Sequence, residues 1–239
     1  MASFVWGRSP QEAFKNPYEW GANEQFALES KALLDGFFDI LMKKNMSFKK
    51  SDTSLEKAEW MLLTDSVDAL IEAILNLDSK KHRITARLFR DVIENIDLLT
   101  FFRSETTKSK NNLAKWFSGE FISHSISREH LLKTDGEEAR AERVKYYRAL
   151  SSFTHRTYGA LCDSYSLGRG DMLVHDTITE SRFMVLPCTL SSYYAVIADL
   201  TIQLSKSLSL SGFITEDELG DCWMTVFKEK SVPRRFVQI

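Results

Sequence analysis

Proline and glycine are rare in this chain, and their rarity limits the folds that it can adopt. There are 4 prolines and 10 glycines among 239 residues, well below their usual shares of about 5% and about 7%. Because these two residues end helices and form turns, a long chain with few of them favours long helices with few connections. The hydrophobic share of 44% is enough to bury a sizeable core between such helices.

Apolar residues recur at helical spacing in several long segments. This spacing predicts helices over 23–44, from about 54 to 77, and over 82–104. A nearly continuous apolar run predicts another helix over 187–208, which we expect to be the most buried one because it is apolar on most faces. The sequence "TEDE" at 215–218 predicts the start of a last helix.

The middle of the chain is less regular. We expect an exposed loop over the polar and basic residues 105–112, followed by short helical pieces. The acidic run after Asp135 is typical of the first turn of a helix, with Asp135 as its cap and an end or bend near 154–159. Residues 172–186 form the one segment whose pattern favours strands, and they predict a small β-like excursion.

These patterns predict an all-α fold, a helical bundle of about six to eight helices with one small β-like excursion near 172–186. Helices joined by short connections pack as antiparallel neighbours. The aromatic-rich residues 1–22 are expected to form an N-terminal arm, and Asn23 is the expected N-cap of the first helix. The remaining residues, 23–239, are expected to form a single helical domain.

The charges nearly cancel, since 31 basic and 33 acidic residues give a net charge of −2. Global attraction to nucleic acid or to an anionic membrane is therefore not favoured, although a local basic patch is compatible with this balance. The three cysteines, Cys162, Cys188 and Cys222, are widely spaced and predict free thiols in a reducing compartment. We expect a cytoplasmic protein that has no metal, no other cofactor and no membrane segment.

The stretch "YYRALSSFTHRTYGAL" places two cationic residues, Arg148 and His155, seven positions apart. In one helix both lie on the same face, together with Ser151 and Ser152. A histidine can move a proton near neutral pH, and an arginine can hold a phosphate or a developing negative charge. The alternative is an ordinary solvated face, with Arg148 paired to an acidic neighbour and His155 bonded to a carbonyl at a helix end.

The segment "RALSSFTH" resembles the motif of the HEPN superfamily, in which an arginine and a histidine are separated by four to six residues on a late helix of a small bundle. The resemblance implies that Arg148 and His155 cut RNA without a metal, often in a site completed by a second subunit. The polar residue that often follows the arginine in this family is replaced here by Ala149.

A second pattern begins in "RLFRDVIENIDLLTFF", where Arg90 and Glu94 lie one turn apart. Together with the later "LSSFTH", it is similar to a broad group of bacterial helical proteins, a likeness that implies a fold and no particular reaction. Arg90 and Glu94 form either an ion pair on a solvated face or an inward pair that needs a buried partner. In the second case we expect Glu94 to lie close to His155.

The leading hypothesis is a bacterial HEPN-like protein that cleaves RNA without a metal or binds a nucleotide. Arg148 and His155 are its predicted catalytic residues. Its predicted substrate contacts are Arg90, Glu94, Ser151, Ser152 and Arg156. The rival hypothesis is a non-catalytic helical interaction module, in which the same arginine, glutamate and histidine residues form a structural network. A protein partner or a second copy of the chain is compatible with both.

Overall fold

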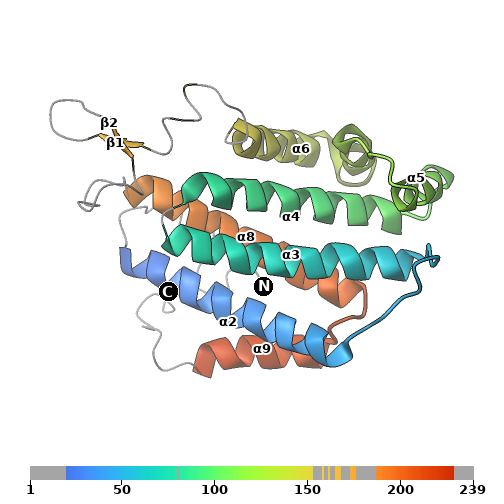
Figure 1. Ribbon diagram of the computed structural model, residues 1–239, viewed down its shortest axis with the longest axis horizontal. Helices are drawn as coiled ribbons and strands as arrows, with labels where there is room; N and C mark the ends of the chain where they lie inside the picture. Colours follow the sequence, from blue (N-terminus) through green and yellow to red (C-terminus); the bar gives the residue numbers. More distant parts are fainter. Residues whose placement is uncertain are drawn as a thin grey trace.

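The computed structural model describes residues 20–79, 81–152, 158, 161, 165–167, 173–175 and 187–228. Seven helices lie in these ranges, which confirms the all-α bundle of six to eight helices (Figure 1). They are α2 (Trp20–Lys44), α3 (Leu55–Asp78), α4 (His82–Arg103), α5 (Thr107–Phe117), α6 (His124–Ser152), α8 (Pro187–Leu210) and α9 (Glu216–Lys228). Among the described residues, no helix is both long and apolar enough to cross a membrane.

A two-stranded hairpin is the small β-like excursion. Strand β1 (Tyr165–Leu167) pairs antiparallel with β2 (Leu173–His175), so that Tyr165 lies opposite His175. Strand β2 falls inside the predicted span 172–186, whereas β1 precedes it. Figure 1 places the hairpin beyond one end of the bundle, away from the core.

The core lies between α2, α3, α4 and α8, which run alongside one another (Figure 1). Their apolar stripes supply the fully buried large side chains, which include Phe37, Leu63, Phe89, Leu99 and Ile197. The helix α9 covers α2, and α6 lies on the outer side of α4. Helix α4 therefore lies between most of the core and α6, and Leu150, Ile126 and Tyr146 of α6 reach the edge of the core.

Helix boundaries follow the sequence signals where a cap is present. Ser54 caps α3, its side chain accepting a hydrogen bond from the Lys57 amide, and α3 begins at the next residue as predicted. At α9, the Thr215 hydroxyl accepts from the Glu218 amide while the Glu218 carboxylate accepts from the Thr215 amide. This reciprocal pair is a capping box, and it confirms the helix start that "TEDE" predicts.

Two predicted boundaries are wrong. Helix α2 begins at Trp20 rather than after a cap at Asn23, because 20–22 contain no proline that would stop the helix from extending. The expected loop over 105–112 is mostly helix α5, which starts at Thr107. Thr106 caps it by accepting from the Ser109 amide at 3.1 Å. The polar residues that indicated a loop form the first turns of this capped helix, where Ser109 and Asn112 are buried and the others are exposed.

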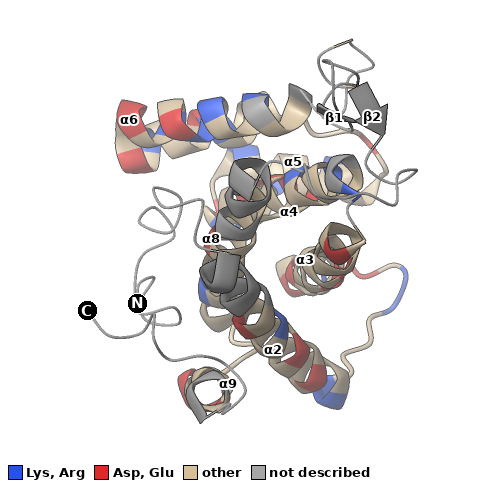
Figure 2. Ribbon diagram, turned by 90° about the vertical axis from the view of Figure 1, so that its left-hand side faces the viewer, with Lys and Arg blue, Asp and Glu red and all other residues tan. Residues whose placement is uncertain are grey.

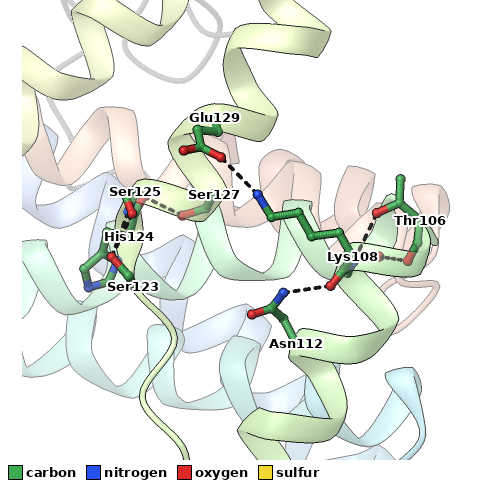
Figure 3. A network of polar contacts seen from close by, with 9 residues as sticks. Thr106, Lys108, Asn112, Ser123, His124, Ser125, Ser127 and Glu129 are labelled. Carbon is green, nitrogen blue, oxygen red and sulfur yellow. Dashed lines mark hydrogen bonds and ion pairs between the residues drawn. The ribbon is translucent and has the colours of Figure 1, made fainter.

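Helix α6 begins at His124, within the segment expected to form short helical pieces, and its second piece begins after Gly136, next to the predicted cap Asp135. Ser123 precedes it, and the Ser123 hydroxyl accepts a hydrogen bond from the Ser125 amide at 3.3 Å (Figure 3). Gly136 interrupts the helix with φ 89 and ψ 179, a conformation that glycine adopts without strain. The helical pieces 124–135 and 137–152 on either side of Gly136 therefore run in different directions along α4.

Candidate functional site

Polar side chains of α4 and α6 meet in a group that we call the α4–α6 cluster: Arg90, Glu94, His124, Arg128 and Tyr147. Glu94 is its centre, because one carboxylate oxygen accepts from Arg90 Nε at 2.6 Å and the other lies 2.9 Å from His124 Nε2. Arg90 Nη2 also donates to the Tyr147 hydroxyl at 2.6 Å. The predicted Arg90–Glu94 pair is thus present on α4, and its contacts with His124 and Tyr147 join α4 to α6.

The ring of Tyr147 lies beside both guanidinium groups of the cluster. The Cζ atom of Arg90 is 4.9 Å from the ring centroid, and that of Arg128 is 5.0 Å from it. The His124 ring lies 5.5 Å from the Tyr147 ring, tilted by 41°. Because His124 and Arg128 precede the break at Gly136 and Tyr147 follows it, these contacts hold both pieces of α6 together against α4.

The environment of Glu94 strongly favours its ionised form. Burial on its own raises the pKa of this carboxyl, but hydrogen bonds from His124, Arg90 and Tyr147 outweigh burial and lower the pKa to about 2. Burial disfavours the charge of Arg90 too, yet the bond to Glu94 leaves its pKa raised above the ordinary value. At neutral pH the Arg90–Glu94 pair is therefore ionised.

A second polar chain crosses from α4 through α6 to α8. Arg143 Nε lies 3.2 Å from Asp97, and Arg143 Nη2 donates to the Gln203 side chain at 2.8 Å. Gln203 in turn donates to Asp199 at 2.7 Å. Burial raises the pKa of both Asp97 and Asp199, although Arg143 opposes this for each. Arg143 therefore contacts Asp97 directly and is linked to Asp199 through Gln203.

Arg148 points away from these two networks. Its side chain is exposed on α6 and makes no ion pair with the residues that the structure describes. With Arg140 and Lys145 it lines an open depression of about 380 Å³, whose other lining residues are Glu137, Ala141 and Val144. Glu137 pairs with Arg140 at 2.8 Å, so the cationic charges of Lys145 and Arg148 are not neutralised there. Figure 2 shows basic and acidic residues alternating along this piece of α6.

The structure separates the predicted site residues into two groups. Arg90 and Glu94 belong to the α4–α6 cluster, whereas Arg148 lies on the outer surface and Ser151 is partly buried near the end of α6. His155, Arg156 and the side chain of Ser152 lie outside the described residues. The expected proximity of Glu94 and His155 therefore stays a prediction.

Sequence reasoning missed His124 as a partner of Glu94. His124 and His130 are six residues apart, a spacing that does not indicate a metal site. Among the described residues, no group of three or more histidine, cysteine, aspartate or glutamate side chains could hold a metal ion. A helix start within "SHSISREH" is the signal that could have placed His124 in the first turn of a helix. Nothing in that stretch indicates that this turn faces α4.

The arrangement offers two kinds of chemistry. An imidazole next to a carboxylate can accept and donate protons, but in the α4–α6 cluster both groups are already engaged with each other. An exposed arginine beside an open depression can instead bind an anion from outside. No protein family, curated protein or solved structure matches this chain.

Proposed function

We propose that this protein binds RNA or a nucleotide through phosphate contacts on the exposed face of α6, with Arg148 as the principal contact. The observation that carries the proposal is the exposed Arg148 beside the open depression, with no ion pair among the described residues. Arginine binds phosphate oxygens through two parallel hydrogen bonds. Lys145 adds a second cation, so the depression carries local positive charge although the net charge of the chain is −2.

The α4–α6 cluster has a supporting role in this proposal. Its arginine, glutamate and histidine side chains bind one another, so they fix α6 on α4 and thereby set the direction in which Arg148 points. Under the HEPN-like hypothesis, His155 moves the proton when RNA is cut, and Arg148 stabilises the charge on the phosphate.

The test measures binding and cleavage of single-stranded RNA by the purified protein in the presence of a chelator, which excludes metal-dependent contaminants. We expect Arg148→Ala to weaken binding, and His155→Ala to abolish cleavage, with unchanged melting temperatures. Lys43→Ala is the matched control, because Lys43 is an exposed cation on α2. Equal activity of the wild type, Arg148→Ala and His155→Ala would contradict the proposal.

A non-catalytic interaction module is the second candidate. It is favoured by the internal pairing of Arg90, Glu94 and His124, which leaves this network structural rather than open to a ligand. In that case RNA neither binds nor is cut, and Arg148→Ala changes neither RNA binding nor stability. A large loss of stability in His155→Ala would identify a structural histidine and would support this second candidate.

A further inference from the structure

Phe121 is the most exposed large hydrophobic residue among those that the structure describes, with 82% of its surface accessible. It lies in the connection 118–123 between α5 and α6. Its chain neighbour Ile122 is only 8% exposed and is part of the buried hydrophobic set. The connection is thus anchored to the body of the protein at the position directly after the exposed ring.

Short-range contacts fix the conformation of this connection. Gly119 adopts a φ of 84, which a glycine reaches without strain, and its amide bonds back to the Trp116 carbonyl at 3.0 Å. At the other end, Ser123 caps α6 (Figure 3). The Phe121 ring stands edge-on to His124, with the ring centroids 6.1 Å apart and an angle of 80°. The exposed position of the Phe121 ring is therefore fixed by the conformation of the connection.

The Phe121 ring begins a row of rings that ends beside a cation. His124 lies between Phe121 and Tyr147, and Arg128 lies over the Tyr147 ring. Arg128 Nε donates to the His124 carbonyl at 3.2 Å, and Arg128 makes no ion pair with the described residues. Of the nearby carboxylates, Glu120 accepts from the Ser118 hydroxyl and Glu129 binds Lys108 (Figure 3). Asp97 is near enough for the charge of Arg128 to lower its pKa, but the two form no ion pair.

We propose that Phe121 is a stacking platform for an unpaired nucleobase, and that Arg128 contacts the phosphate backbone of the same strand. This inference rests on the proposed function, because it assigns a second contact to the same RNA ligand. An exposed aromatic ring combined with a basic side chain farther along the same surface is the arrangement that binds single-stranded nucleic acid without sequence preference. Every base offers a planar face to such a ring.

A nucleobase fits this place better than a protein partner does. A stable protein interface buries about 800 Å² on each side around an apolar centre. Ile122 is buried, and the other residues of the connection, Ser118, Gly119, Glu120 and Ser123, have no apolar side chain that would extend the ring into an apolar patch. One ring with polar surroundings covers one planar group.

The experiment measures anisotropy of a fluorescein-labelled single-stranded RNA of about 10 nucleotides. Phe121→Ala is expected to weaken binding at least about 5-fold, whereas Phe121→Trp retains it because the larger ring still stacks. Met42→Ala is the control, because Met42 is 61% exposed on α2. A second RNA carries 2-aminopurine, whose fluorescence falls on stacking; we expect the decrease with the wild type and not with Phe121→Ala.

The outcomes separate this inference from the proposed function. If Phe121→Ala binds RNA as tightly as the wild type and Arg148→Ala does not, the stacking platform is wrong and the α6 phosphate contact stands. If Phe121→Ala weakens binding and Arg148→Ala does not, the platform stands and the principal contact is not Arg148. If the wild type binds no RNA, both proposals are overturned.

Discussion

The α3–α4 contact and the α4–α6 contact share one helix but differ in their balance of apolar and ionic contacts. Arg103 of α4 pairs with Glu59 of α3 at 2.6 Å, and Leu150 of α6 belongs to the core, so neither contact is of one kind alone. On one side, α4 packs apolar residues such as Phe89 and Ile93 into the core with α3. On its other side, Arg90, Glu94 and Asp97 reach ionic or polar partners on α6. Contacts of the first kind gain stability in proportion to buried area, whereas contacts of the second kind depend on geometry and on protonation.

The two sides of α4 should therefore respond to different perturbations. Apolar packing does not titrate, so the α3–α4 contact, in which the Arg103–Glu59 pair adds to a mainly apolar interface, should depend less on pH than the α4–α6 contact. The α4–α6 contact contains Glu94, Asp97 and Arg143, and both carboxyl groups have a displaced pKa. The piece of the molecule that carries Arg148 is therefore also the piece that we expect to loosen first.

The largest effect is expected from Ile197→Asp in α8. Ile197 is fully buried in the core, and an unpaired carboxylate there costs several kcal/mol, enough to prevent folding. Circular dichroism and thermal melting check this result. Ile197→Val is the control and should cost about 0.5–1.5 kcal/mol. A normal melting temperature for the aspartate variant would contradict the central position of α8.

The next effect concerns the other side of α4. Glu94→Gln keeps the shape of the side chain but removes the charge that Arg90 and His124 share. We expect a loss of about 2–3 kcal/mol, since removing one partner leaves the other charges poorly compensated. Hydrogen exchange should increase in 124–152 while α3 stays protected. Equal loss of protection in α3 and α6 would show that the two contacts are not separable.

The pH dependence of Glu94 sharpens the same point. Its folded pKa is about 2 against an ordinary value of 4.5, so its stabilisation is present above about pH 4.5 and is lost as the pH falls towards 2. The stability difference between wild type and Glu94→Gln should therefore shrink in this window. Asp97 and Asp199 have raised folded pKa values, so their contribution to stability changes with pH in the opposite direction. Because wild type and Glu94→Gln both contain these two residues, their contribution largely cancels in the difference. Denaturant titrations at several pH values measure the difference, and a constant gap would contradict the assignment.

A smaller effect is expected where α2 meets α9. A Cβ atom at Gly36 would lie 2.9 Å from Cys222 Sγ, so Gly36→Ala should destabilise the protein by about 1–2 kcal/mol through overpacking. In a Cys222→Ala background the clash is removed, and the same change should stabilise α2 through the better helix propensity of alanine. Thermal melting of the wild type, the two single variants and the double variant gives a double-mutant cycle. Additive effects of the two changes would contradict the contact.

The smallest effect is expected from Lys108→Ala. This residue forms an ion pair with Glu129 between α5 and α6 (Figure 3), and both side chains are more than half exposed, at 52% and 58%. Solvent screens such a pair, so its loss should leave the melting temperature unchanged. A clear decrease would show that α6 depends on its solvated contacts as much as on the α4–α6 cluster.

The fold class and most helix positions could be predicted from the spacing of apolar residues alone. The apolar repeat of 82–104 predicts α4 to within one residue, and the run over 187–208 predicts α8, because a helix that buries a face must repeat apolar residues along it. The same spacing placed Arg90 and Glu94 one turn apart, and the structure pairs them. Local polarity misled at 105–112, where a cap at Thr106 outweighs a polar composition.

The partners of the polar face of α4 could not be predicted in this way, because they depend on how the helices pack. Helical periodicity shows that Glu94 and Asp97 lie off the apolar stripe, but it does not say which distant residue faces them. His124 reaches Glu94 and Arg143 reaches Asp97 because α6 lies along α4, and Arg148 faces outward for the same reason. The physical reason is that local spacing fixes the face of a helix, whereas its neighbour is selected by the packing of the whole chain.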